Sequence, residues 1–233
     1  MKRIQWIASA MLLSVAAVQA QTVDDIVAKH VNAIGGKEKL GQVKSIYSEV
    51  SMEVMGNTAP SIEYLVAGKG FKSETDFNGS KIVNCITDKG GWSLNPMMGA
   101  SDPQPMPDNL YKAAKDQIYV GGPLVDYAAK GYKAELDGKE GDDYKIKLSG
   151  DGVESYYYID PTSYYLKKVV SKSEMMGQPI DVTTTYSDFK KTDFGIVLPY
   201  ARNVDLGQFQ LDQKVTKIEV NKEIDPKIFE MSK

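Results

Sequence analysis

Apolar residues recur at helical spacing directly after residue 21. They are separated by three or one positions and would form one face of a helix: Val23, Ile26, Val27, His30, Val31 and Ile34. Thr22 precedes this face as a candidate N-cap, with Asp25 at the acidic position of a capping box. Gly35 and Gly36 follow it, as residues that end helices do. The pattern predicts an amphipathic helix over 22–34, with a short helical turn after it at 37–43.

From Ser45 the period of the pattern changes to two. Ile46, Val50, Met52 and Val54 alternate with polar residues, which is typical of a strand with one buried face. More strands follow at hairpin distances, and Asn78-Gly79 is the strongest hairpin signal among the turns. We expect them near 62–66, 71–77, 82–87, 92–94, 132–136, 144–148, 153–159, 164–172, 178–189, 196–205 and 208–221. This pattern predicts an antiparallel meander.

A different segment divides these strands into two groups. Residues 95–107 contain four prolines, too many for a helix or strand, and predict a loop. Helical spacing returns over 108–130, beginning at an Asp108 cap and again at Pro123. We therefore expect a helical insert between the two runs of strands.

The last expected strand changes parity along its length. Phe209, Leu211 and Val215 fall on one face by simple alternation, whereas Ile218 and Val220 fall on the other. One residue of this strand should therefore be bulged.

The first 20 residues have the form of a secretory leader. Lys2 and Arg3 precede an apolar run that is shorter than the ~20 residues a membrane span needs, and small residues stand before Ala20. Cleavage after Ala20 would make Gln21 the first residue of the mature chain. Bacterial lipidation requires a cysteine at that first position. We expect residues 1–20 to be a signal peptide and 21–233 a single domain, periplasmic, not lipidated and not membrane-spanning.

Charge and composition exclude several functions. Without Lys2 and Arg3 the chain carries 26 of its 28 basic residues against 31 acidic ones, so it is weakly acidic and a poor nucleic-acid binder. One histidine, His30, and one cysteine, Cys85, are too few for a zinc site or a paired nucleophile, and both lie among apolar residues as packed side chains do. We expect no metal, no cofactor and no catalytic residue. A pair of carboxylates that meet only in space is the enzyme alternative left open.

The order of elements and several turn motifs resemble the LolA/LolB-like outer-membrane lipoprotein carrier and sorting proteins. The motifs that carry the resemblance are Gly91-Trp92-Ser93-Leu94-Asn95-Pro96, Tyr158-Ile159-Asp160-Pro161-Thr162, Tyr186-Ser187-Asp188-Phe189, Gly195-Ile196-Val197-Leu198-Pro199 and Ile218-Glu219-Val220-Asn221. The resemblance implies a mainly β fold with helices: an incomplete antiparallel β-barrel, or half-barrel, covered by short helices. It also implies an apolar cavity for acyl chains of a lipoprotein or lipid, with an inner-membrane donor and an outer-membrane acceptor as partners. Known carriers of this kind hold their lid closed with an arginine on an early strand, and this chain has none between Arg3 and Arg202.

Apolar content suggests which residues would line that cavity. We expect Ile46, Val50, Met52, Val54, Ile62, Tyr64, Trp92 and Leu94 of the strands, Met97 and Met98 of the proline-rich loop, and Leu110 and Leu124 of the insert. The two loop methionines fit either a mobile apolar rim or simple loop packing.

Two functions from different classes fit the sequence. The first is a carrier of acyl-chain cargo that does no covalent chemistry. The second is an envelope interaction or sensor module that binds a protein partner through its tyrosine-rich strands, at 156–158 and 164–165. An enzyme comes third.

Overall fold

The computed structural model of this 233-residue chain describes residues 21–54, 56–175 and 177–231. The predicted leader, 1–20, lies outside the described residues. The helices are α1 (Val23–Ala33), α2 (Lys37–Gly41) and α3 (Asp108–Ala114), with 3-10 turns η1 (Pro96–Met98), η2 (Lys115–Ile118), η3 (Tyr127–Lys130) and η4 (Pro226–Phe229). The capping box is confirmed: the Thr22 hydroxyl accepts the Asp25 N–H, and the Asp25 carboxylate accepts the Thr22 N–H.

Every described strand belongs to one sheet. The strands are β1 (Ser45–Val54), β2 (Asn57–Val66), β3 (Gly70–Phe77), β4 (Ser80–Thr87), β5 (Gly91–Leu94), β6 (Gln104–Pro105), β7 (Lys133–Glu140), β8 (Asp143–Gly150), β9 (Val153–Ile159), β10 (Leu166–Met175), β11 (Gln178–Lys191), β12 (Val197–Asp205) and β13 (Gln210–Val220). Asn78 and Gly79 both have positive φ, 53° and 81°, as the predicted two-residue hairpin turn requires.

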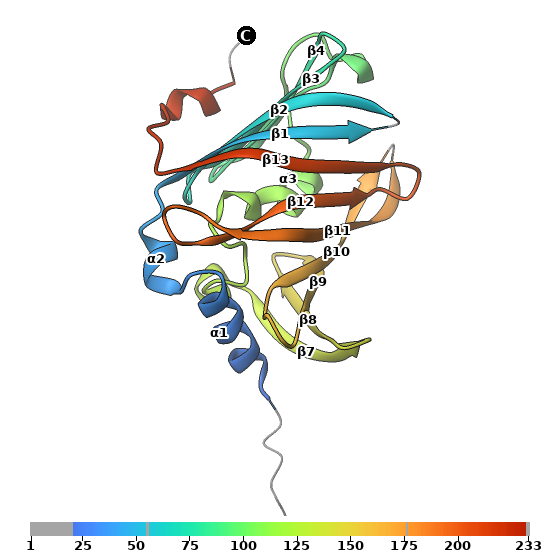
Figure 1. Ribbon diagram of the computed structural model, residues 1–233. Coiled ribbons are helices and arrows are strands. Elements are labelled where there is room, and N and C mark those ends of the chain that lie inside the picture. The colour runs from blue at the N-terminus through green and yellow to red at the C-terminus, as the bar shows by residue number, and fades with distance from the viewer. Residues whose placement is uncertain (1–20, 55, 176, 232–233) are drawn as a thin grey trace, which may run out of the picture.

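The 13 strands form an open half-barrel. Their order is β6-β5-β4-β3-β2-β1-β13-β12-β11-β10-β9-β8-β7, so the first and last long strands pair at the centre, antiparallel like their neighbours. The edge strands β6 and β7 do not pair with each other, and the curved sheet stays open (Figure 1). The predicted fold class, an incomplete antiparallel barrel with short helices, is confirmed.

The helical insert between β6 and β7 connects the two edges of the sheet. It therefore has to cross the concave side: η2 contacts β2, β3 and β4, and α3 contacts β10. Figure 1 shows α3 behind β12 and β13. Among the described residues, no helix has the length and apolarity that crossing a membrane requires.

The strand register defines two faces of the sheet. Val54 lies opposite Leu211, Leu211 opposite Val204, and Val204 opposite Thr184. The row continues because Thr184 lies opposite Val169, and Val169 opposite Tyr157. Tyr157 packs beneath α1. We call the face that carries this row the inner face, because the helices cover it, and the other the outer face.

The predicted cavity lining is divided between these faces. The short β1–β2 connection pairs Val54 with Asn57, so even-numbered residues of β1 lie beside odd-numbered residues of β2. Val50 is therefore on the inner face, whereas Ile62 and Tyr64 are on the outer face. Trp92 and Leu94 follow them to the outer face, through the pairings across β3, β4 and β5. Ile62, Tyr64, Trp92 and Leu94 therefore do not share a face with Val50, because the face on which a strand's residues lie is set by its turn as well as by its own pattern.

The predicted bulge in the last long strand is confirmed. Val215 lies opposite Val50 and Lys217 opposite Glu49, so Thr216 is the extra residue. Its hydroxyl donates to the carbonyl of Glu49 at 3.1 Å. The bulge brings Ile218 and Val220 to the inner face together with Leu211 and Val215.

The buried apolar residues form cores on both faces. On the inner face, Ile26 and Val27 of α1 pack on Ile146, Leu148 and other residues of β8 and β9, and an adjoining cluster joins Ile34, Leu40 and Val43 to Val125 and Ile196. On the outer face, Val83, Cys85 and Trp92 pack under Phe229 of η4. The space between α1 and the sheet is thus a packed core.

The middle of the chain differs from its sequence pattern in three details. The proline-rich segment contains η1 and the two-residue edge strand β6, because a proline fits the first turn of a helix and the edge of a sheet. The residue that caps α3 is Pro107, and Asp108 begins the helix itself. The second helical piece of the insert is only the 3-10 turn η3, which begins at Tyr127.

Candidate functional site

An open apolar groove runs between α1 and the segment that carries η3. It has a volume of about 610 Å³, within the ~300–1,000 Å³ typical of sites for small organic ligands. Its lining consists of Asp24, Val27, Ala28, Val31, Asn32, Lys37, Leu124, Val125, Asp126, Tyr127, Ala128 and Ala129. Val27, Leu124 and Val125 are buried members of the inner-face cores, so the floor of the groove is continuous with the core.

Polar contacts join the two walls of the groove. The Tyr127 hydroxyl donates to the Asp24 carboxylate at 2.5 Å, and the Lys37 amine lies 2.6 Å from the Asp126 carboxylate. Both contacts are exposed, and an exposed ion pair contributes only about 0–1 kcal/mol. These contacts can break at small cost, which would let the walls separate.

The η3 wall is anchored from behind by Lys130. Its amine donates to the carbonyls of Gly122 and Val125 and lies 4.3 Å from the centre of the Tyr119 ring. Burial lowers the pKa of Lys130 to about 8. The anchor therefore holds the backbone that carries Leu124 and Val125 in place.

Lys130 also lines a smaller polar pocket of about 320 Å³. One of its three carboxylates, that of Asp116, accepts the hydroxyl of Tyr132 at 2.8 Å, and burial raises the pKa of Asp116. The Lys115 amine beside it forms an ion pair with Asp151 at 2.6 Å. These contacts join Asp116 and Lys115 of η2 to Tyr132 and Asp151, so the pocket links the insert to the sheet.

The inner face also carries buried polar side chains. Ser48, Ser61 and Thr75 are buried there on β1, β2 and β3, and the hydroxyls of Ser61 and Thr75 lie 2.9 Å apart. Arg202 of β12 reaches across to Glu63 of β2, with Nη2 2.5 Å from the carboxylate. Two strands, β1 and β13, lie between β2 and β12 in the sheet, so this ion pair spans the hollow of the half-barrel.

The lone histidine is part of the packing. His30 is buried in α1, and its Nδ1 lies 2.9 Å from the carbonyl oxygen of Tyr164. A carbonyl only accepts, so Nδ1 carries the proton. Burial lowers the pKa of the imidazole. His30 is thus a neutral structural side chain that attaches α1 to the turn before β10.

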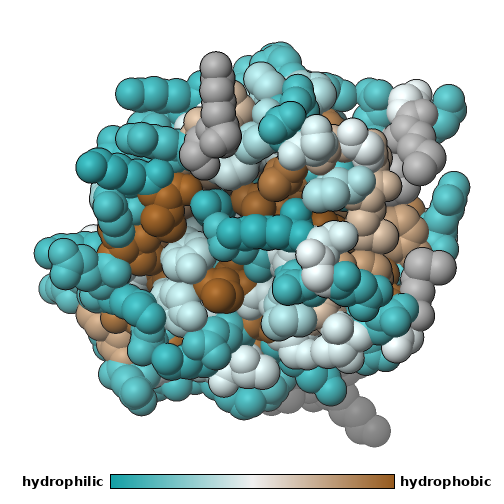
Figure 2. Space-filling view, turned by 90° about the horizontal axis from the view of Figure 1, so that it is seen from above, coloured by the Kyte–Doolittle hydropathy of each residue, from teal (hydrophilic) through white to brown (hydrophobic). Residues whose placement is uncertain are grey.

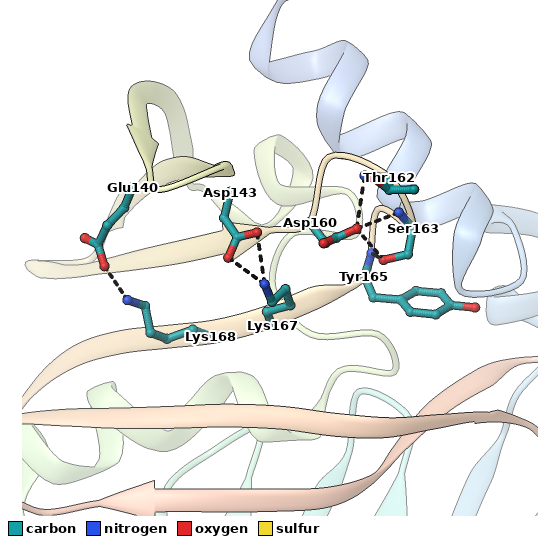
Figure 3. Close-up of polar contacts among 8 residues, drawn as sticks. All are labelled: Glu140, Asp143, Asp160, Thr162, Ser163, Tyr165, Lys167 and Lys168. Atoms are coloured by element: carbon teal, nitrogen blue, oxygen red, sulfur yellow. Dashed lines mark hydrogen bonds and ion pairs between the residues drawn. The ribbon is translucent and has the colours of Figure 1, made fainter.

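That turn is built by one of the motifs that carry the family resemblance. The Asp160 carboxylate accepts the N–H groups of Thr162 and Ser163 at 3.0 and 2.7 Å and the Ser163 hydroxyl at 2.9 Å (Figure 3). These hydrogen bonds, above all the one from the Ser163 N–H, lower the pKa of Asp160. The motif shapes a turn and presents the Tyr164 carbonyl to His30.

The lone cysteine is equally inaccessible. Cys85 is fully buried in the outer-face core, and burial raises the pKa of its thiol to about 11. In the described ranges, His, Cys, Asp and Glu side chains form no group of three that could hold a metal ion.

The residues predicted to line a cavity are dispersed. Ile46, Val50, Met52 and Val54 share the inner face, and Leu124 lies in the floor of the groove. Leu110 lies partly buried on α3 in the insert. Met97 and Met98 are 60% and 70% exposed on η1, outside the groove. The predicted residues of β1 thus lie together on one face, whereas the other predicted residues lie in different parts of the molecule.

Lysines cover the tyrosine-rich strands. Tyr157 is buried on the inner face and Tyr158 on the outer face. The Lys168 amine lies 3.9 Å from the centre of the Tyr158 ring, and the Lys145 amine 4.4 Å from that of Tyr156. Figure 2 shows apolar atoms on the upper face of the molecule in separate patches among hydrophilic ones. Lysine amines thus lie over two of the three tyrosine rings at 156–158.

The sequence reasoning missed the groove and the Arg202–Glu63 pair. The groove walls contain small residues such as Ala28 and Ala128, whose role depends on a contact between segments about 100 residues apart. Arg202 carried a usable signal, since it is the only arginine after residue 20 and lies in a strand between Tyr200 and Val204.

This architecture is that of the LolA-like lipoprotein carrier and sorting proteins, so the resemblance is confirmed at the level of the fold. A LolA superfamily protein from Nitrosomonas europaea superposes with a TM-score of 0.59 and 12% identity over 90% of this chain and 97% of that one. A DUF1329 family protein from Desulfovibrio piger superposes with a TM-score of 0.58 and 15% identity, over 90% of this chain and 98% of that one. A domain from Vibrio parahaemolyticus assigned to outer membrane lipoprotein sorting superposes with a TM-score of 0.54 and 13% identity, over 87% of this chain and 95% of that one. No family model and no curated protein matches the sequence itself.

Proposed function

We propose that this protein is a periplasmic carrier that shelters the acyl chains of a lipoprotein or lipid on their way to the outer membrane. The observation that carries the proposal is the apolar groove whose floor, Val27, Leu124 and Val125, is continuous with the core. Burying an acyl chain contributes about 0.8 kcal/mol per CH₂, so a chain of a dozen carbons would bind firmly there.

Release of such cargo needs a site that opens at small cost. The exposed Asp24–Tyr127 and Lys37–Asp126 contacts support this, because they close the groove with weak bonds. An inner-membrane donor and an outer-membrane acceptor would be the partners of the transfer. The leader at 1–20 would supply export, and the protein would do no covalent chemistry.

Native mass spectrometry of gently purified protein tests the proposal directly. The expected result is a mass increment that organic solvent removes and that corresponds to acyl-containing molecules. An empty protein that captures a defined protein partner would instead support the interaction-module alternative.

A pair of tryptophan variants tests the site. Ala128→Trp should fill the groove and weaken binding of a fluorescent fatty-acid ester at least tenfold. Ala113→Trp, on an exposed position of α3 outside the groove, should leave binding unchanged. Equal binding by both folded variants would exclude the groove as the acyl site.

A further inference from the structure

The Arg202–Glu63 pair leaves one donor of the guanidinium unused. Glu63 accepts from Nη2, whereas the Nε–H is buried and no acceptor among the described residues reaches it. A buried donor without an acceptor destabilises the free protein, and any group that supplies an acceptor there is favoured. The position is on the inner face, where the side chains of Arg202 and Glu63 are only 22% and 15% exposed.

Apolar side chains continue from this donor toward the ends of the strands. Arg202 lies opposite Gln213, and Gln213 opposite Met52. The next residues outward on the same face are Val204, Leu211 and Val54, which lie opposite one another and are partly exposed. A ligand atom that accepts from Nε therefore has an incompletely covered apolar surface beside it, as a head group with an attached acyl chain would need.

The charge at this site is already balanced. The Glu63 carboxylate neutralises the guanidinium, so a second carboxylate at Nε would lie beside Glu63 and be repelled in a partly desolvated place. A neutral carbonyl oxygen can accept the single Nε–H without adding charge.

We propose that Arg202 recognises the neutral carbonyl of an ester- or amide-linked acyl chain, and that Glu63 excludes free fatty acids. The inference rests on the proposed function, since it assigns a head-group contact and a substrate class to acyl cargo. Arg202 and Glu63 do not line the groove between α1 and η3, so this contact is a second one, on the inner face of the sheet. The protein would thus discriminate lipid-linked chains from the products of their hydrolysis.

Three twelve-carbon probes test this by competition with a fluorescent reporter, at pH 8 and below their aggregation concentrations. They are the glycerol ester monolaurin, the amide N-lauroylethanolamine and the anion laurate. The parent protein should bind the two neutral probes about tenfold or more tightly than laurate. The ratio of the two neutral probes separates glycerol-linked from amide-linked cargo.

Glu63→Gln provides the decisive variant. It removes the repulsive charge and leaves the guanidinium unbalanced, so laurate should gain at least tenfold and the preference should disappear or reverse. The double variant Glu63→Gln/Arg202→Met removes the donor without leaving a buried unpaired charge, and it should bind all three probes with similar weak affinity.

Lys72→Met/Glu74→Gln is the matched control. These residues form a comparably covered ion pair on the outer face, at 2.8 Å and with side chains 13% and 22% exposed, and their removal should leave the probe preference unchanged. If the parent protein binds laurate as well as monolaurin, or if Glu63→Gln keeps the preference, the Arg202 proposal is overturned and acyl binding stands. If none of the three probes binds, both the Arg202 proposal and the proposed carrier function are wrong.

Discussion

Thr216 donates its hydroxyl to the backbone carbonyl of Glu49, 3.1 Å away, and is the residue that the pairing of β13 with β1 skips between Val215 and Lys217. Because of this bulge, the apolar residues on both sides of it, Val215 and Ile218, face the inner side of the sheet.

Deleting Thr216 should therefore be far more damaging than altering it. The deletion would turn Ile218 and Val220 to the outer face, and a loss of several kcal/mol or failure to fold is expected. Thr216→Ala keeps the bulge and loses one hydrogen bond, which costs about 1 kcal/mol. Urea denaturation of both variants measures the difference. A deletion variant as stable as Thr216→Ala would contradict the register.

A charge introduced on the inner face of β1 should abolish acyl binding, whereas a charge on the outer face should leave it unchanged. Met52→Lys places an ammonium on the inner face, in the same cross-strand row as Gln213 and Arg202, and should abolish binding of a neutral acyl probe. Val50→Lys should do the same and also destabilise the fold by several kcal/mol, since Val50 is only 2% exposed. Ser51→Lys, on the outer face, should bind the probe as the parent does. Circular dichroism confirms the fold in each case.

His30 should make stability depend on pH in the acid range. Burial lowers the pKa of the folded imidazole below its ordinary 6.5, so the unfolded chain binds more protons as the pH falls. The stability that His30 provides is fully present above about pH 6.5 and is lost as the pH falls through the folded pKa.

The variant His30→Gln isolates this effect. It should be less stable than the parent by about 1–2 kcal/mol at pH 8, and the difference should shrink at pH 5. Denaturant unfolding at both values measures it, and an unchanged difference would show that His30 does not titrate on unfolding. Acyl binding at pH 8 should be retained.

Gly70 should be needed for the outer-face core. A Cβ at this position would lie 2.8 Å from the Phe229 ring, so Gly70→Ala should displace η4 and cost about 1–3 kcal/mol. Trp92 reports the change, because its Nε1 donates to the Phe229 carbonyl at 2.9 Å and it is the only tryptophan after residue 20. A red-shifted emission is expected. Gly41→Ala, with open space around it, is the control and should leave the emission unchanged.

Export should produce a mature chain that begins at Gln21 and carries no lipid. The reason is the form of the leader, with small residues before Ala20 and no cysteine after it. N-terminal sequencing and the intact mass of periplasmic material check it. A start elsewhere, or fractionation with membranes, would count against the leader assignment.

The sequence by itself determined the features that depend on neighbouring residues. The capping box at Thr22, the hairpin at Asn78-Gly79 and the bulge in β13 follow from local spacing, since each is formed by residues a few positions apart or by the parity of one strand. The alternation of β1 likewise predicted one common face for Ile46, Val50, Met52 and Val54.

Only the tertiary structure decided which strands and segments meet. The turn after Val54 placed Ile62 and Tyr64 on the outer face, although their own pattern is as apolar as that of β1. The groove needs α1 against η3, and the Arg202–Glu63 pair joins residues 139 positions apart across a curved sheet. Such contacts depend on curvature and on the path of the insert, which arise from the packing of the whole chain and leave no periodic signal in any one segment.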